Sequence, residues 1–222
     1  MDRLTVKRLF NLENTVAKSM LEKHIYPWEI IPKIRDCIFL LGEALDVREY
    51  EKVGECVYIS RYAKIDNNAK IEGACIIGKG ATLRKGAYLR GNCIIGDGCV
   101  IGNSSEIKNS ILFNESQVPH FNYVGDSILG YKSHLGAGAK ISNLKSDKTP
   151  VSITVNNEKI KTDLKKLGAI LGDYVEVGCN AVLNPGTVVG RNTTIYPLSN
   201  VRGYVSENCI YKSANEIVGK GE

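Results

Sequence analysis

Two kinds of side chain in the middle of this sequence could act on a charged small molecule. His120 carries an imidazole, whose unperturbed pKa lies near working pH, so it could take a proton from a nucleophile. Arg90 and Lys108 carry a guanidinium and an ammonium, which pair strongly with phosphate oxygens. Proton transfer beside a bound anion is therefore chemistry that these side chains could perform, provided that the fold brings them together.

The chain around these residues repeats every six positions. Aliphatic residues stand at every sixth position across 59–107, 129–141 and 171–201, and a small residue follows most of them after four positions. A period of six fits neither an amphipathic helix nor a simple alternating strand. It is typical of a solenoid whose coil has three flat faces, and the eighteen hexads predict about six coils.

Stacking of the coils would position the candidate residues. Neighbouring coils stack as parallel strands about 4.8 Å apart, so residues eighteen positions apart lie one above another. Arg90 and Lys108 are such a pair, and both can therefore reach one anion. The repeat is interrupted around 113–121, which predicts a loop that carries His120.

The flanking segments do not follow the repeat. Residues 12–50 have helical spacing, and we expect 1–52 to form an N-terminal α-helical cap over the first coil's open edge. A docking surface for a partner is the alternative for this cap. We expect the solenoid over residues 53–206 and a C-terminal tail over 207–222.

An excursion over residues 144–170 interrupts the solenoid. Its alternating segment 151–155, the turn residues Asn156-Asn157 and the segment 159–161 predict a hairpin. It could close over a ligand or clasp a neighbouring subunit, and a plain solvated loop is the alternative.

Composition bounds the possible partners and the compartment. A net charge of +5 suits an anionic small ligand, but it is not the clustered footprint of a nucleic-acid-binding protein. No apolar run reaches membrane-spanning length and no signal peptide is recognisable, so we expect a cytoplasmic protein without a membrane partner. Seven cysteines without a CxxC motif argue against a disulfide framework, and Cys75, Cys93 and Cys99 are expected as buried filler.

The segment from Asn103 to Asp126 resembles the acetyltransferase domain of bifunctional bacterial enzymes that acetylate glucosamine 1-phosphate and then uridylylate the product. It contains N-x-x-E-x-K and H-x-x-Y-x-G-D, and G-A-G-x-x-x-x-N follows, ending at Asn143. The segment Lys165–Asp173 is similar to archaeal sugar-phosphate nucleotidyltransferase/acetyltransferases. The resemblance covers about residues 59–206 and implies an all-β solenoid, a left-handed parallel β-helix, that assembles as a homotrimer.

The resemblance also implies roles for matching residues. His120 corresponds to the general base, with Tyr123 and Asn143 positioning the sugar and its amine. Arg90, Lys108 and Lys148 correspond to the phosphate clamp. The other matches are Glu106 and His134 at the substrate, the latter where the family commonly has asparagine, and Ala137, Cys179 and Pro197 at the coenzyme site.

The implied reaction moves an acetyl group from acetyl-coenzyme A (acetyl-CoA) to the amine of an amino-sugar 1-phosphate, in synthesis of nucleotide sugars such as UDP-N-acetylglucosamine. A thioester is already activated, so neither a covalent acyl-enzyme nor a metal is required. Residues 1–58 are too few for a nucleotidyltransferase domain, so we expect no activity on UTP and name a separate nucleotidyltransferase as a candidate partner.

Two alternatives belong to other classes. A non-catalytic trimeric scaffold, or regulatory subunit of a separate sugar nucleotidyltransferase, would need the solenoid but not His120. A zinc carbonic anhydrase of the same fold needs three histidine ligands, two of them close in sequence. Here the only histidines are His24, His120 and His134, and His24 lies in the expected cap.

Overall fold

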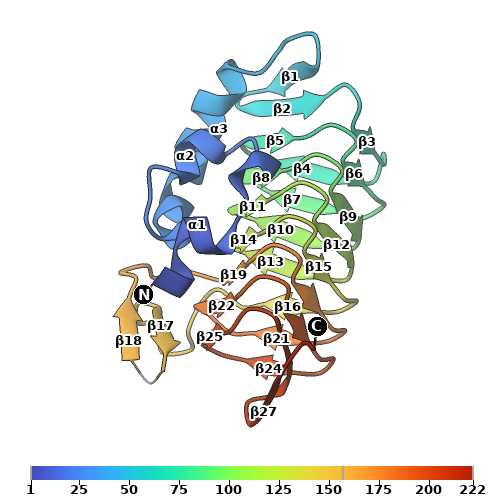
Figure 1. Cartoon of the computed structure of the whole chain (residues 1–222). Coiled ribbons are helices and arrows are strands. Elements are labelled where there is room, and N and C mark those ends of the chain that lie inside the picture. The colour runs from blue at the N-terminus through green and yellow to red at the C-terminus, as the bar shows by residue number, and fades with distance from the viewer. Residues whose placement is uncertain (1, 157, 222) are drawn as a thin grey trace.

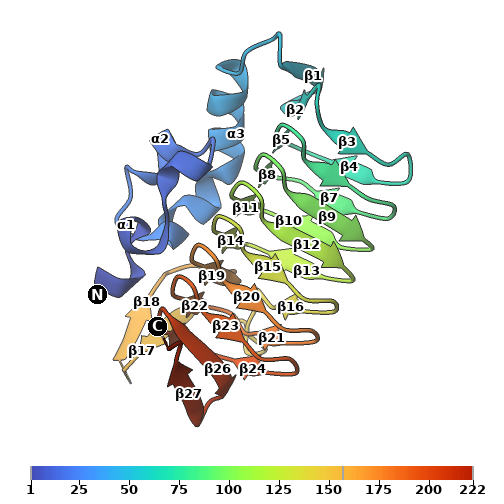
Figure 2. The same ribbon diagram turned by 45° about the vertical axis from the view of Figure 1, so that its right-hand side comes forward.

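The computed structural model describes residues 2–156 and 158–221 and has three sheets wound into a triangular parallel solenoid (Figures 1 and 2). Each coil adds one short strand to sheet I, then one to sheet II and one to sheet III. This is the predicted fold class. The aliphatic residue of each six-residue repeat faces the axis of the solenoid, and together these residues form one continuous core.

The strands of each sheet follow in spatial order. Sheet I contains β1 (Tyr50–Gly54), β2 (Val57–Ser60), β5 (Cys75–Ile77), β8 (Cys93–Ile95), β11 (Ser110–Leu112), β14 (Ile128–Leu129), β19 (Ala169–Leu171), β22 (Thr187–Val189) and β25 (Tyr204–Val205). Sheet II contains β3 (Lys64–Ile65), β6 (Thr82–Leu83), β9 (Val100–Asn103), β12 (Gln117–His120), β15 (His134–Leu135), β20 (Glu176–Val177), β23 (Thr194–Ile195), β26 (Cys209–Ser213) and β27 (Glu216–Gly219). Sheet III contains β4 (Lys70–Glu72), β7 (Tyr88–Arg90), β10 (Glu106–Lys108), β13 (Tyr123–Gly125), β16 (Lys140–Ile141), β21 (Val182–Leu183) and β24 (Asn200–Val201).

The predicted number of coils was wrong. Over the described residues the chain makes seven complete coils, from β2–β3–β4 to β22–β23–β24, and β25 and β26 begin an eighth. The segment 113–121 is not an interruption but part of a regular coil. Ile95 pairs with Ile77, eighteen positions earlier, whereas Leu112 pairs with Ile95 over only seventeen.

The coil that ends at Leu112 is one residue shorter than the coil before it, and the shortening lies at the corner between sheets III and I. Asn109 turns this corner in the third coil and Asp126 turns it in the fourth, with positive φ angles of 46° and 49°. The step between inward aliphatics shortens there from six residues to five, from Ile107 to Leu112. His120 therefore ends strand β12, and the expectation that it lies on a loop was wrong.

The N-terminal helices cover the outside of sheet I (Figure 1). Because the outward residues of this sheet are aliphatic, including Ile76, Ile94 and Ile111, they need an apolar cover, and all three are buried. The open edge of the first coil is covered by β1, which pairs with β2 in antiparallel fashion. The cover consists of η1 (Asp2–Leu4), α1 (Val6–Leu9), η2 (Leu12–Asn14), α2 (Lys18–Leu21), η3 (Pro27–Lys33) and α3 (Ile34–Glu43).

The excursion leaves the solenoid after β16 and forms the antiparallel hairpin β17 (Ser152–Val155) and β18 (Glu158–Lys161). Of its predicted turn, Asn157 lies outside the described residues. Val151 and Ile153 are buried in the same apolar cluster as Val188, so the hairpin is packed against the solenoid.

The C-terminal end of the solenoid is formed by two further strands. Residues 209–219, within the expected C-terminal tail, form β26 and β27, which extend sheet II.

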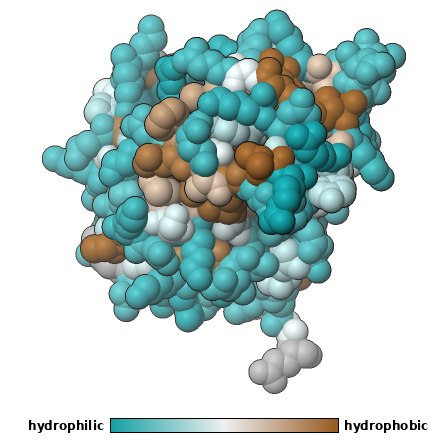
Figure 3. Space-filling model, turned by 90° about the horizontal axis from the view of Figure 1, so that it is seen from above, coloured by the Kyte–Doolittle hydropathy of each residue, from teal (hydrophilic) through white to brown (hydrophobic). Residues whose placement is uncertain are grey.

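Seen from above, the surface is mainly hydrophilic with scattered apolar patches (Figure 3). None of the helices in the described part of the chain is long and apolar enough to span a membrane.

Candidate active site

His120 lies in a vertical column of residues at the corner between sheets II and III. It pairs with Asn103 of the coil before, and the register of Gln117 with His134 places Ala137 on the other side of His120. The same register continues to Cys179 and Pro197. The structure thus brings the three residues predicted to line the coenzyme site into one line with His120.

The corner carries apolar surface. Phe121 and Leu198, each directly after a member of the column, have positive φ angles of 53° and 61°. Ser104, Gly138 and Asn180 have positive φ angles at the same corner of other coils, so this conformation is the regular turn of the solenoid. Both side chains point outward, with 56% and 78% of their surface exposed. The column therefore has apolar surface beside it.

The imidazole of His120 is exposed. The backbone N–H of His120 donates to Asn122 Oδ1 at 3.0 Å, and its carbonyl accepts from Gly138 at 2.9 Å. Within the described chain no hydrogen bond engages the ring nitrogens. The backbone is thus fixed while the ring can accept a proton.

The two predicted cations lie on sheet III in adjacent coils. Leu89 pairs with Ile107, so Arg90 and Lys108, the next residues, lie one above the other as predicted from their spacing. Each already has a carboxylate partner. Arg90 Nη1 lies 2.8 Å from Glu106 Oε1, and Lys108 Nζ lies 3.8 Å from Asp126 Oδ2. An incoming phosphate would compete with these carboxylates.

Asn143 connects the cation pair to Tyr123. Its Nδ2 donates to Asp126 Oδ2 at 2.5 Å and lies 3.4 Å from the Tyr123 hydroxyl. Gly125 makes this approach possible, because a Cβ there would lie 2.6 Å from Asn143 Nδ2 and 2.8 Å from the Tyr123 hydroxyl. Burial raises the pKa of Tyr123, and the charges of Glu106 and Asp126 add to the shift. The phenol therefore stays protonated at neutral pH and can donate a hydrogen bond.

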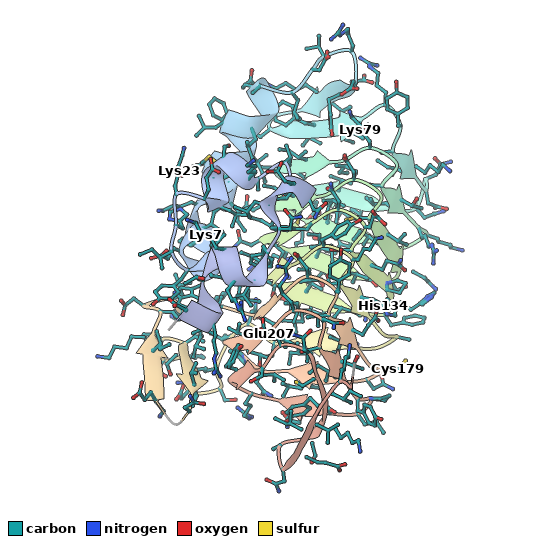
Figure 4. The ribbon with its side chains drawn as sticks, in the orientation of Figure 1. Lys7, Lys23, Lys79, His134, Cys179 and Glu207 are labelled. Carbon is teal, nitrogen blue, oxygen red and sulfur yellow. The ribbon has the colours of Figure 1, made fainter. Side chains whose placement is uncertain are left out.

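A second histidine forms its own pair on sheet II. His134 Nδ1 lies 2.9 Å from Glu176 Oε2 in the next coil, and both side chains are partly exposed. Figure 4 shows His134 and Cys179 on the same side of the solenoid. The carboxylate can orient the ring so that Nε2 faces outward.

Sequence reasoning gave no role to Glu176 or Asp126. Glu176 lies forty-two positions from His134 because the excursion intervenes, so spacing could not reveal the pair. Asp126 did have a signal, since it ends the motif H-x-x-Y-x-G-D that was used for the resemblance.

Some predicted residues are not brought together within the chain. No hydrogen bond or ion pair among the described residues joins His120 to Arg90 or Lys108. Strand β13 lies between His120 and the corner at Asp126, a span on the order of 10 Å. Lys148 is exposed in the excursion, and its backbone N–H bonds to Lys145. Its side chain makes no hydrogen bond or ion pair with the clamp residues.

Comparison with known proteins gives a family match over most of the solenoid. The family model described as the GMPPB C-terminal domain matches residues 71–196. A bifunctional sugar-1-phosphate nucleotidylyltransferase/acetyltransferase of Sulfurisphaera tokodaii is 38% identical over 88 residues, which is 40% of this chain and 22% of that protein. The bifunctional protein GlmU of Methanococcus maripaludis S2 is 36% identical over 112 residues, 50% of this chain and 27% of that protein.

The chain thus spans about a quarter of the length of these curated relatives. Among solved structures, the acetyltransferase domain of PglB from Neisseria gonorrhoeae, in complex with acetyl coenzyme A, aligns with a TM-score of 0.34 and 14% identity. That alignment covers 74% of this chain and 57% of that chain.

Proposed function

The chain belongs to the family of the GMPPB C-terminal domain, and we propose that it transfers an acetyl group from acetyl-CoA to the amine of an amino-sugar 1-phosphate. The observation that carries this proposal is the arrangement across strand β13. The imidazole of His120 lies at one end, the cations of Arg90 and Lys108 lie beside the other end, and Tyr123 with Asn143 lies between. The name of the Sulfurisphaera tokodaii relative, a bifunctional sugar-1-phosphate nucleotidylyltransferase/acetyltransferase, supports a sugar phosphate as acceptor.

The phosphate would bind between Arg90 and Lys108. A phosphate dianion carries more negative charge and more acceptor oxygens than one carboxylate, so it can compete with Glu106 and Asp126 for the two cations. The sugar would then extend along β13 toward His120, with the protonated Tyr123 hydroxyl and the Asn143 amide available to its hydroxyls. Lys148 would have to move, or come from a neighbouring subunit, to serve as the third cation.

His120 would act as the general base. Its free ring nitrogen takes a proton from the neutral sugar amine as the amine nitrogen forms a bond to the thioester carbonyl carbon. The carbon–sulfur bond then breaks, and the imidazolium returns the proton to the coenzyme thiolate. Acetyl-CoA would lie along Ala137, Cys179 and Pro197, which continue from His120 toward the later coils.

A homotrimer fits this arrangement, because the coenzyme column lies at an exposed corner of one subunit. The apolar side chains of Phe121 and Leu198 would be covered by a neighbouring subunit or by the coenzyme. Analytical ultracentrifugation of the full chain tests the trimer. A stable monomer with full activity would contradict it.

The direct test of function is thiol release from acetyl-CoA with glucosamine 1-phosphate, galactosamine 1-phosphate and nucleotide-linked amino sugars as acceptors. We expect turnover with a phosphorylated amino sugar and none with its N-acetylated form, which lacks the nucleophile. A silent acceptor panel from a folded protein would overturn the enzyme proposal and favour a scaffold.

A further inference from the structure

A polar cavity of about 460 Å³ lies between the excursion and the later coils of sheet III, and it begins at Ser142, next to Asn143 of the proposed active site. The start of the excursion forms one wall, the hairpin β17–β18 a second and the corners after β21 and β24 a third. The charged and hydroxyl-bearing side chains that line it include Ser142, Lys145, Asp147, Thr154, Lys159 and Arg202.

The cavity is built from fixed parts. Val151 and Ile153 anchor the hairpin, with 1% and 0% of their surfaces exposed. Gly203 has a φ of 69°, and a Cβ there would lie 2.7 Å from the carbonyl oxygen of Thr154. The hairpin can approach the last coils this closely only because Gly203 has no side chain. The cavity is thus preformed, and little ordering is needed when a ligand binds.

Its charge favours an anion. Lys145, Lys159 and Arg202 contribute three cations against the single carboxylate of Asp147. Asp147 is already paired with Lys145 at 3.4 Å, whereas Lys159 and Arg202 make no ion pair with any described residue. Hydroxyl groups of Ser142 and Thr154 supply further donors. The described residues that line the cavity include no aromatic ring, so they offer oxyanion contacts but no surface on which a base would stack.

We propose that this cavity binds the phosphoryl group of a small molecule, as a second anion site distinct from the clamp at Arg90 and Lys108. Lys108 belongs to the third coil and Arg202 follows the last strand of the seventh. Four coils at about 4.8 Å each separate them by about 19 Å, too far for one sugar phosphate to bridge. This site does not depend on acetyl transfer.

Calorimetric titration of the full chain with inorganic pyrophosphate tests the proposal. We expect saturable binding that weakens at least tenfold in Lys159→Ala and in Arg202→Ala. Lys165→Ala is the matched control, because Lys165 is an exposed lysine of the same excursion that does not line the cavity. It should change affinity less than twofold. Thermal unfolding of each variant establishes that the exposed substitutions leave the fold intact.

Three results would overturn the site. The first is the absence of saturable binding to the wild-type chain, and the second is equal weakening by Lys165→Ala, which would indicate diffuse charge. The third is a loss with Arg90→Ala as large as with Arg202→Ala, because the anion would then sit in the clamp. These outcomes are independent of turnover, so failure of this proposal and of acetyl transfer can be told apart.

The same titration identifies the source of the phosphoryl group. If coenzyme A displaces pyrophosphate and dephospho-coenzyme A does not, the site holds the 3′-phosphate of the coenzyme. If neither displaces it, the occupant is a separate phosphorylated compound. Either result, together with the losses in Lys159→Ala and Arg202→Ala, supports an anion site in the cavity.

Discussion

The side-chain amide of Asn143 donates a hydrogen bond to Asp126 Oδ2 at 2.5 Å, at the point where the excursion leaves the solenoid. Backbone bonds close the base of the excursion at the same place. The N–H of Leu167 donates to the Asn143 carbonyl at 3.0 Å, and that of Gly168 to the Asp126 carbonyl at 2.8 Å. One pair of residues thus fixes both the excursion and the part of the proposed active site that contains Tyr123.

Asn143→Ala should therefore lower both activity and stability. It removes the donor to the nearly buried Asp126 carboxylate, which costs about 1–3 kcal/mol of unfolding free energy. It also removes the contact to Tyr123, and we expect kcat/KM to fall by about ten- to a hundredfold. Denaturant unfolding and steady-state kinetics measure the two effects. Asn68→Ala, at an exposed turn of the first coil, is the control and should change neither.

His120→Ala should abolish most turnover and leave stability nearly unchanged. General-base catalysis contributes about 10²–10⁴-fold, whereas an exposed side chain at a strand end changes unfolding free energy by about 0.5 kcal/mol or less. Thiol release and thermal unfolding measure the two effects. His24→Ala, within the N-terminal segment, serves as the matched control. Activity of His120→Ala within about threefold of wild type would remove the base from the mechanism.

Arg90→Ala should affect the acceptor more than the coenzyme. Loss of a charge-assisted hydrogen bond to phosphate costs about 1.5–3 kcal/mol, so KM for the phosphorylated acceptor should rise about ten- to a hundredfold. KM for acetyl-CoA should stay within about twofold of wild type, because its column lies at the other corner. Equal increases in both KM values would contradict the clamp. Arg84→Ala, in the corner after β6, is a control with the same change in charge.

The cysteines predict a selective thiol titration. Burial raises the pKa of Cys75 and Cys99 to about 12, so these thiols remain protonated as the pH rises from 7 to 9. Cys179 is exposed and should react first with a coloured disulfide reagent, and bound coenzyme A should slow that reaction if it covers the column. All seven thiols should react after denaturation. Rapid reaction of Cys75 or Cys99 in the native protein would contradict the packed core.

Asp173→Ala should destabilise the attachment of the N-terminal segment. The Asp173 carboxylate is fully buried, pairs with Arg191 at 2.5 Å and accepts the backbone N–H groups of Asn11 and Tyr131. The Arg191 side chain is 35% exposed and can be solvated, so the main loss is the acceptor of the two N–H groups, which costs about 1–3 kcal/mol and which denaturant unfolding would detect. Asp66→Ala, at an exposed turn, should cost about 1 kcal/mol or less. A similar small effect at Asp173 would show that the helices attach by apolar contacts alone.

The sequence by itself determined the three-faced coil and the stacking of Arg90 on Lys108. Each of these follows from local spacing, because a six-residue period decides which side chains face the axis and which residues share a column. The spacing of the inward residues also indicates the coil that the prediction missed. The steps from Ile107 to Leu112 and from Val124 to Leu129 are five residues long and each shifts the repeat by one position. A search for a strict period of six therefore interprets the segment between them as a loop.

Only the tertiary structure decided which polar groups meet. Glu176 reaches His134 across the excursion, Asp126 takes both Lys108 and Asn143 as partners, and Lys159 and Arg202 line one cavity. A periodic pattern records the direction of each side chain relative to the axis. It does not record how many residues leave the solenoid between two coils, and that number decides which polar side chains become neighbours.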